Sequence, residues 1–361
     1  MTTPARRTFR PGTTVPTSAE PSGFPGAPGF PGYDPEAPPL AVDDLRVEFA
    51  ATRTRPRTTV VDGASYQVDA GRTLAVVGES GSGKSLTARA ALGVLPPGAR
   101  VVSGSVRLHG IDLLTLDPHR LGALRGRHLG LVFQDALAAL NPVLPVGYQI
   151  AEMYRVHERA SRKQAALRAV AMLDRVRIPD AARRAGDYPH QFSGGMRQRV
   201  LIAMALALTP RVLIADEPTT ALDVTVQARI LDLLRELQQE HHLALVLISH
   251  DLAVVARAAD EVAVMYAGRV VERAPADTLY ARPAHPYTRA LMDAVPRRGR
   301  RGLPLAALPG TPPDPAHLPG GCPFRPRCPL AGEECATAPA THTAGPGHTS
   351  ACHHWQEVTA A

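Results

Sequence analysis

The strongest constraint on the fold of this chain is a glycine-rich run of eight residues, Gly78-Glu79-Ser80-Gly81-Ser82-Gly83-Lys84-Ser85. A compact apolar run, Thr73 to Val77, precedes it, and the helix-compatible segment Ser85 to Leu95 follows it. This order predicts a buried parallel strand that turns directly into a helix. The run fits the pattern G-x-x-x-x-G-K-[ST], whose glycines let backbone N–H groups curl around phosphates at a helix N-terminus. We therefore expect an α/β core that binds a nucleotide such as ATP through all eight residues.

Two residues of this phosphate loop have separate roles. Lys84 is one of only two lysines among 40 basic residues, Lys163 being the other, so a chain that otherwise uses arginine keeps a lysine here. Its ammonium suits the phosphates of ATP, and the Ser85 hydroxyl suits Mg²⁺. A glycine-rich turn that binds no ligand is the alternative, and the flanking strand and helix argue against it.

A second apolar strand ends in two carboxylates. Val212 to Ala215 is followed directly by Asp216 and Glu217, at the carboxyl edge of the expected sheet where ligands bind. Asp216 is suited to holding Mg²⁺, and Glu217 is suited to polarising the attacking water as a general base. A solvated acidic loop would explain the pair alone. Beside the phosphate loop, the pair predicts a P-loop NTPase.

Changes in residue composition and hydrophobic pattern divide the chain into regions. Residues 1 to 40 hold ten prolines and five glycines and are expected to be a disordered tail. Strand-like alternation from residue 41 to 68 predicts an antiparallel sheet, and a polar, helical texture from about 135 to 205 predicts an inserted helical subdomain. A further buried strand at 243–248 follows the helical run 226–239, which predicts a mostly parallel sheet covered by helices. The nucleotide-binding domain would span 41–295, and a cysteine- and proline-rich extension 296–361.

Composition excludes two classes of function. The formal net charge is +7, but the basic residues are scattered and not interleaved with aromatic residues, so nucleic-acid binding is not expected. No stretch approaches the roughly 20 apolar residues that cross a bilayer. We expect a cytoplasmic location.

A third motif narrows the family. The run Phe192-Ser193-Gly194-Gly195-Met196-Arg197-Gln198-Arg199 resembles the signature motif of ABC ATPases, with Met196 where many members carry Gln. Ser193, Gly194 and Gly195 would open a helix and offer a second phosphate-binding N-terminus.

The remaining family elements follow in the expected order over residues 41 to 295. Gln134 resembles the Q-loop glutamine, Asp223 in Ala221-Leu222-Asp223 the D-loop aspartate, and His250 the switch histidine, while Phe49 lies where the family places an aromatic ring that stacks on adenine. Each alone has a plainer interpretation: a core aromatic for Phe49, a helix N-cap for Asp223, and surface polar residues for Gln134 and His250.

The resemblance implies a P-loop NTPase (RecA-like) core with the antiparallel β subdomain and inserted helical subdomain of ABC ATPases. It implies ATP hydrolysis with Glu217, His250, Gln134 and Lys84 as catalytic residues and with Mg²⁺ held by Ser85, Asp216 and Gln134. In the family, the signature motif of one ATPase subunit closes over the ATP of another, as an arginine finger does in trans.

A finer resemblance concerns the cargo. The phosphate loop, Asn141-Pro142, the signature run, His285-Pro286-Tyr287-Thr288 and the Cys-Pro tail resemble the dipeptide/oligopeptide-importer group, which also includes nickel and other small-solute importers. This implies three kinds of partner: two integral-membrane permease subunits, an extracytoplasmic substrate-binding protein and a second ATPase subunit. The second ATPase subunit is expected to differ from this chain, so a heterodimer is favoured over a homodimer. The resemblance also implies a peripheral position on the cytoplasmic face of the membrane. A soluble ABC ATPase and a small-molecule kinase are the competing classes; the single phosphate loop argues against the first and Ser193 against the second.

All four cysteines, Cys322, Cys328, Cys335 and Cys352, lie near the C-terminal end. A cytoplasmic location disfavours disulfides, and the gaps of five, six and sixteen residues fit zinc motifs poorly. Four thiolates can hold a [4Fe–4S] cluster, and the resembled group is similar in carrying such a tail with a cluster as its ligand. Zinc with His353 or His354 and four unliganded thiols are the alternatives.

Overall fold

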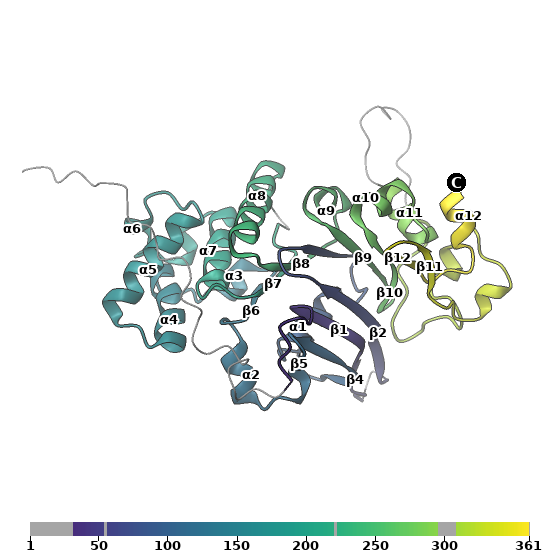
Figure 1. Cartoon of the computed structure of the whole chain (residues 1–361), viewed down its shortest axis with the longest axis horizontal. Coiled ribbons are helices and arrows are strands. Elements are labelled where there is room, and N and C mark those ends of the chain that lie inside the picture. The colour runs from purple at the N-terminus through teal and green to yellow at the C-terminus, as the bar shows by residue number, and fades with distance from the viewer. Residues whose placement is uncertain (1–31, 54–55, 220–221, 295–307, 361) are drawn as a thin grey trace, which may run out of the picture.

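The fold is described from a computed structural model of the chain, which describes residues 32–53, 56–219, 222–294 and 308–360. Figure 1 shows two sheets at the centre, a group of helices at one end and the C-terminal segment at the other. The tail expected over residues 1–40 lies mostly outside the described residues. Leu40 already belongs to the first strand.

The larger sheet has the strand order β11-β12-β10-β9-β3-β8-β7-β6. The strands from β9 to β6 pair in parallel, and β10, β12 and β11 extend one edge in antiparallel pairing. The bounds are β3 (Thr73–Val77), β6 (Leu129–Val132), β7 (Val212–Asp216), β8 (Ala244–Ser249), β9 (Glu261–Tyr266), β10 (Arg269–Pro275), β11 (His342–Gly345) and β12 (His348–Ser350). The mostly parallel sheet predicted from the apolar runs is therefore present.

The smaller sheet is antiparallel, with the order β2-β1-β4-β5. Its strands are β1 (Leu40–Phe49), β2 (Thr58–Val68), β4 (Ala99–Leu108) and β5 (Ile111–Asp112). The antiparallel pairing expected over residues 41 to 68 is confirmed. Strand β4, which pairs with β1, was not expected.

The helices fall into three groups along the chain. Between the strands lie α1 (Lys84–Ala91), η1 (Leu113–Thr115) and α2 (Pro118–Leu124). The helical end contains α3 (Ala136–Ala139), α4 (Val146–Glu158), α5 (Arg162–Arg175), α6 (Ala181–Arg184), η2 (Pro189–Gln191) and α7 (Gly194–Leu206), within the range expected to be helical. The remainder are α8 (Val224–His241), α9 (Leu252–Ala258), α10 (Ala276–Ala281), α11 (Pro286–Asp293), η3 (Arg325–Arg327), η4 (Glu334–Ala336) and α12 (Trp355–Ala360).

The parallel part of the larger sheet is buried on both faces. All five residues of β3 are buried, and the last four alternate between two hydrophobic clusters. Leu74 and Val76 pack with the antiparallel sheet and α1, whereas Ala75 and Val77 pack with α9 on the opposite face. Continuous apolar strands of this kind are required when a parallel sheet is covered on both sides.

The C-terminal segment shares the core of the rest of the chain. Strand β12 pairs with β10, and Cys322, Phe324 and Cys335 belong to the same buried cluster as Tyr266 and Tyr287. The extension expected after residue 295 is thus packed against the sheet over its described residues.

A buried carboxylate joins this segment to the sheet. Glu272 of β10 is 1% exposed, and it accepts hydrogen bonds from the backbone N–H of Ala284 (2.6 Å) and His285 (3.0 Å). His348 Nε2 of β12 lies 2.8 Å from Glu272 Oε1. Burial lowers the pKa of His285 to about 3, so its imidazole is neutral, and its Nδ1 accepts from the N–H of Tyr287 at the start of α11.

We predict that Glu272→Ala destabilises the protein. The change leaves two buried N–H groups and His348 without their acceptor, which should lower the free energy of unfolding by about 3 kcal/mol. Urea unfolding of the full chain measures this. Glu152→Ala on α4, where the side chain is exposed, is the control and should change stability by less than about 0.5 kcal/mol. Equal effects of the two substitutions would contradict the role of Glu272.

Candidate functional site

The phosphate loop lies between β3 and α1, where two glycines determine its shape. Gly78 has φ 154°, and a Cβ there would lie 2.2 Å from the carbonyl oxygen of Met265. Gly83 has φ 99° and forms the N-cap of α1, with a Cβ position 3.0 Å from the carbonyl oxygen of Val60. Only glycine fits both the space at Gly78 and the conformation at Gly83. The loop is therefore held tightly between β9, β2 and the helix that follows.

Lys84 lies inside this loop. Its side chain is buried, and Nζ donates hydrogen bonds to the carbonyl oxygens of Gly78 (2.8 Å) and Glu79 (2.8 Å). Burial lowers the pKa of Lys84, while the charges of Glu217, Asp216 and Glu79 act in the opposite direction. These carboxylates favour the protonated amine, and a buried ammonium is a strong binding partner for anionic phosphate because little solvent screens its charge.

Ser85 and Asp216 meet across the sheet. The Ser85 hydroxyl donates to Asp216 Oδ1 at 2.8 Å, and Asp216 is 2% exposed at the end of β7. Burial raises the pKa of Asp216, and the hydrogen bond from Ser85 partly offsets this. A hydroxyl beside a desolvated carboxylate is an oxygen donor set that fits Mg²⁺, because the cation would compensate the buried negative charge.

Glu217 is contacted by two of the residues singled out by sequence. Gln134 Nε2 donates to Glu217 Oε2 at 2.8 Å, and His250 Nδ1 lies 3.2 Å from Glu217 Oε1. The three residues follow β6, β7 and β8, which are neighbours in the sheet, so their side chains converge at one edge. Glu217 adopts φ 46°, a left-handed conformation that non-glycine residues rarely take and that concentrates at functional sites.

The signature residues lie apart from this cluster. Ser193 is the N-cap of α7, where its Oγ accepts from the N–H of Met196 at 3.4 Å. Gly194 is exposed, as is Ser193, and a Cβ on Gly195 would lie 2.5 Å from Val226 Cγ1. In the part of the chain that the structure describes, no hydrogen bond joins these residues to the phosphate loop.

Two further residues have local roles. Asp223 caps α8, where its Oδ1 accepts from the N–H of Thr225 (3.1 Å) and Val226 (3.0 Å), as the plainer interpretation expected. Ala221 of the same motif lies outside the described residues. Phe49 is partly exposed at the end of β1, where its backbone pairs with Thr58.

The rest of the loop adds a contact that sequence reasoning missed. Ser82 is buried, whereas Ser80 and Gly81 are exposed. Glu79 is bound by Arg327 through its carboxylate and by the Tyr287 hydroxyl through its backbone N–H. The sequence offered a weak signal for Tyr287, which lies in one of the resembled motifs, and none for Arg327.

The four cysteines are brought into one neighbourhood. Cys322, Cys335 and Cys352 are buried, Cys328 is half-buried, and all four are free thiols. Burial raises the pKa of Cys352 to about 12, and the charges of the other three thiols act on it in the same direction. The backbone N–H of Cys322 donates to the carbonyl oxygen of Cys335 at 3.0 Å, and Cys328 packs against the buried cluster that contains these two cysteines.

Three side chains of this segment bring possible metal-ligand atoms closer together than any three of the cysteines do. Ligand atoms of Glu334, Cys335 and His354 all lie within 4.8 Å of one another, with His354 Nε2 2.6 Å from Glu334 Oε1. Within the described ranges, no three of the cysteines come this close. His353 instead lies 3.2 Å from the carbonyl oxygen of Thr337.

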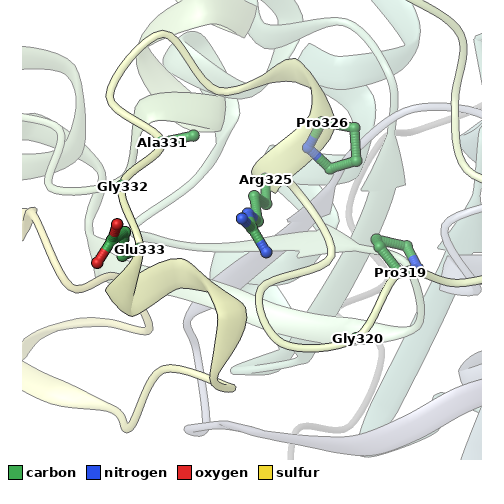
Figure 2. A pocket seen from close by; sticks show the side chains of 7 residues that line it. All are labelled: Pro319, Gly320, Arg325, Pro326, Ala331, Gly332 and Glu333. Carbon is green, nitrogen blue, oxygen red and sulfur yellow. The ribbon is translucent and has the colours of Figure 1, made fainter.

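A shallow hollow also opens on the C-terminal segment (Figure 2). None of its lining residues belongs to the phosphate loop; they are Pro319, Gly320, Arg325, Pro326, Ala331, Gly332 and Glu333. Among the described helices, none combines the length and apolar character needed to cross a membrane.

The loop that encloses Lys84, the Ser85–Asp216 pair and the carboxylate of Glu217 together define a P-loop nucleoside triphosphatase on a parallel sheet. Comparison with known protein families shows which kind of P-loop nucleoside triphosphatase this is. Residues 61–220 match the family described as ABC transporter, and residues 271–335 match the C-terminal region of oligopeptide/dipeptide transporters.

Individual relatives agree with this match. The chain is 48% identical over 313 residues to the oligopeptide transport ATP-binding protein OppD of Escherichia coli strain K12, covering 87% of this chain and 92% of that protein. It is 47% identical over 337 residues to a putative peptide import ATP-binding protein of Brucella abortus strain 2308, covering 90% and 99%. The chain therefore belongs to the ABC transporter family, as one of its ATP-binding, ATP-hydrolysing proteins.

A solved structure supports the fold. The dimeric ATP-binding cassette MJ0796, in a post-hydrolysis state bound to ADP and Pi, superposes with a TM-score of 0.59 at 26% identity. The match covers 66% of this chain and 98% of that one. The ABC ATPase fold expected from the sequence is therefore confirmed.

We predict that Glu217→Gln keeps ATP binding while hydrolysis falls by a factor on the order of 10² to 10⁴, because an amide cannot take the proton of the attacking water. The substitution preserves the shape that contacts Gln134 and His250. Turnover and ATP affinity are measured on the same preparation. Hydrolysis within about threefold of wild type would reject the assignment.

Lys84→Ala is the matched contrast. It removes the positive charge inside the loop, so it should weaken ATP binding itself, in addition to turnover. Unchanged ATP affinity in a folded Lys84→Ala protein would contradict the placement of the phosphates in this loop.

Proposed function

We propose that this chain is the ATPase subunit of an importer of dipeptides or oligopeptides. The observation that carries the proposal is the match of residues 271–335 to the C-terminal region of oligopeptide/dipeptide transporters, since this region lies outside the part common to ABC cassettes. The named relatives, an oligopeptide transport protein and a peptide import protein, support the same cargo. Nickel or another small solute is the alternative cargo, and a soluble ABC ATPase the alternative class.

The geometry supports a specific division of labour in hydrolysis. Backbone N–H groups of residues 78–85 and the ammonium of Lys84 would bind the phosphates of ATP. Ser85, Asp216 and Gln134 would hold Mg²⁺, which neutralises phosphate charge when it is bound. Glu217 would accept the proton of the attacking water, with its carboxylate oriented by Gln134 and His250.

The second half of the site would come from another ATPase subunit. Ser193 and Gly194 are exposed at the start of α7, which leaves this helix N-terminus free to meet ATP held by a second chain. Asp223 would lie in the same interface, and Phe49 would stack on the adenine. The similar cassette MJ0796 is dimeric. We propose a heterodimer rather than a homodimer, because the resembled importer group often pairs two different ATPase subunits.

The helical end of the chain offers a surface for membrane partners. Leu137, Val143 and Tyr148 are 56%, 74% and 46% exposed, and they follow closely on Gln134. Large apolar side chains that stay exposed to solvent are candidates for contact with partner proteins. We assign them to contacts with the cytoplasmic helices of two integral-membrane permease subunits. Under this proposal the protein lies at the cytoplasmic face of the membrane. An extracytoplasmic substrate-binding protein would deliver the cargo.

The assembled complex tests this proposal. We expect the full chain to co-purify from detergent-solubilised membranes with two permeases and a distinct second ATPase. In proteoliposomes with the binding protein, we expect ATP-dependent uptake of labelled peptide and none in a complex that carries Glu217→Gln. Uptake of Ni²⁺ in place of peptide would contradict the cargo. If the isolated chain hydrolysed ATP at a rate that did not depend on protein concentration or on any partner, the proposal that two ATPase subunits share the site would be contradicted.

We also propose that the four cysteines hold a [4Fe–4S] cluster. A single zinc ion with Zn–S bonds of about 2.3 Å would bring its four sulfurs within about 3.8 Å of one another. No three of the thiols in the described ranges lie within 4.8 Å of one another, so they are not arranged for a single zinc ion. The proposal of a cluster rests on the resemblance of this cysteine-rich tail to that of the peptide-importer group. Such a cluster would fix the loops around Cys322, Cys328, Cys335 and Cys352.

Anaerobically purified protein is expected to be brown and to contain about four iron atoms and acid-labile sulfide per chain. Cys328→Ser should lose most of both, because it removes one of four ligands. Colourless protein with stoichiometric zinc would instead support the site of Glu334, Cys335 and His354, and protein without any metal would contradict both.

A further inference from the structure

The cysteine-rich segment touches the phosphate loop through one ion pair. Arg327 Nη1 lies 2.6 Å from Glu79 Oε2, and Nη2 lies 3.0 Å from Glu79 Oε1, which is a two-pronged guanidinium–carboxylate contact. The two residues are 248 positions apart in the chain. The arginine side chain is only 5% exposed, so this contact is shielded from solvent and is of the kind that resists screening by salt.

The position of Arg327 is determined by its surroundings. It is the last residue of η3, which lies between Cys322 and Cys328, and its Nε donates to the carbonyl oxygen of Pro309 at 2.7 Å. Its guanidinium also lies 5.8 Å from the ring centre of Tyr266 and 5.9 Å from that of Phe324. The cysteine-rich segment therefore presents this guanidinium in one orientation.

A second contact reaches the same loop residue. The Tyr287 hydroxyl accepts a hydrogen bond from the backbone N–H of Glu79 at 2.8 Å. The carbonyl oxygen of Glu79 in turn accepts from Lys84 Nζ. Glu79 is thus held from outside the loop by Arg327 and Tyr287 and is bonded inside the loop to the lysine that faces the phosphates.

The charge of Glu79 explains why this arrangement matters. An unpaired carboxylate in the second position of a phosphate loop would repel the anionic ligand of that loop. Arg327 neutralises the carboxylate and draws it toward the C-terminal segment. We propose that Arg327 is a positioning residue for ATP binding, and that the cysteine-rich segment sets the affinity of the phosphate loop through the Arg327–Glu79 pair. The inference rests on the nucleotide site proposed above.

The test is a double-substitution cycle on the full chain with MgATP as the ligand. Arg327→Met keeps much of the packing but removes the charge, and it should raise the Kd and KM for ATP about tenfold while kcat changes much less. Adding Glu79→Gln to Arg327→Met removes the carboxylate that has lost its arginine partner, and it should restore most of the lost affinity for ATP. Arg327→Lys, which keeps the charge but not the two-pronged geometry, should fall between wild type and Arg327→Met.

Arg325→Ala is the matched control, because Arg325 lies two residues away in the same η3 helix but is exposed and lines the hollow of Figure 2. It should leave ATP affinity within about twofold of wild type. Affinity in Arg327→Met equal to wild type, or a loss that Glu79→Gln does not reverse, would overturn the proposal. If Arg327→Met does not fold, the ATP affinities of Arg327→Lys and Arg325→Ala are compared instead. Equal affinities of these two variants would overturn the proposal. Failure of the wild-type chain to bind ATP would instead reject the nucleotide site.

Discussion

The chemistry of this molecule depends on the parallel pairing of β6, β7, β8 and β3. These strands are covered on both faces, so their interiors must be apolar, and polar groups are tolerated only where the strands end. Parallel pairing brings all these ends to one edge. Gln134, Glu217 and His250 therefore meet there although their positions in the chain span more than a hundred residues, and the phosphate loop leaves β3 at the same edge.

Much of this fold could be predicted, because its central strands are continuous apolar runs with strong local signals. Residues 73–77, 212–215 and 243–248 are examples, and the buried strands differ from these ranges by at most one residue at either end. Helix α1 was expected to reach Leu95 but ends at Ala91, because Gly93 takes a left-handed φ of 61° and prolines follow. Local signals locate an element better than they locate its end.

The elements that sequence reasoning missed are formed by tertiary contacts. Strand β4 contains Ser103, Gly104 and Ser105 at its centre, so its pattern is weak, and pairing with β1 is what makes it a strand. The β11–β12 hairpin is short and polar, and it depends on β10 and on the buried contact between His348 and Glu272. For the same reason the role of Arg327 could not be predicted. A single arginine in an arginine-rich chain carries no sequence signal, and its contact with Glu79 exists only in the folded protein.

The separation of the N-termini of α1 and α7, which we propose both bind phosphate, has a physical consequence. The N-terminus of α1 is enclosed by the loop around Lys84, whereas the N-terminus of α7 is exposed on the helical end of the chain. A chain that held both ends in one cleft could bind and hydrolyse ATP without moving any other part of an assembly. With the ends apart, the exposed helix N-terminus would attract a nucleotide only when another subunit supplied that nucleotide. Under the proposed arrangement, ATP binding and closure of the subunit interface are one event, which is what coupling hydrolysis to movement of a membrane partner requires.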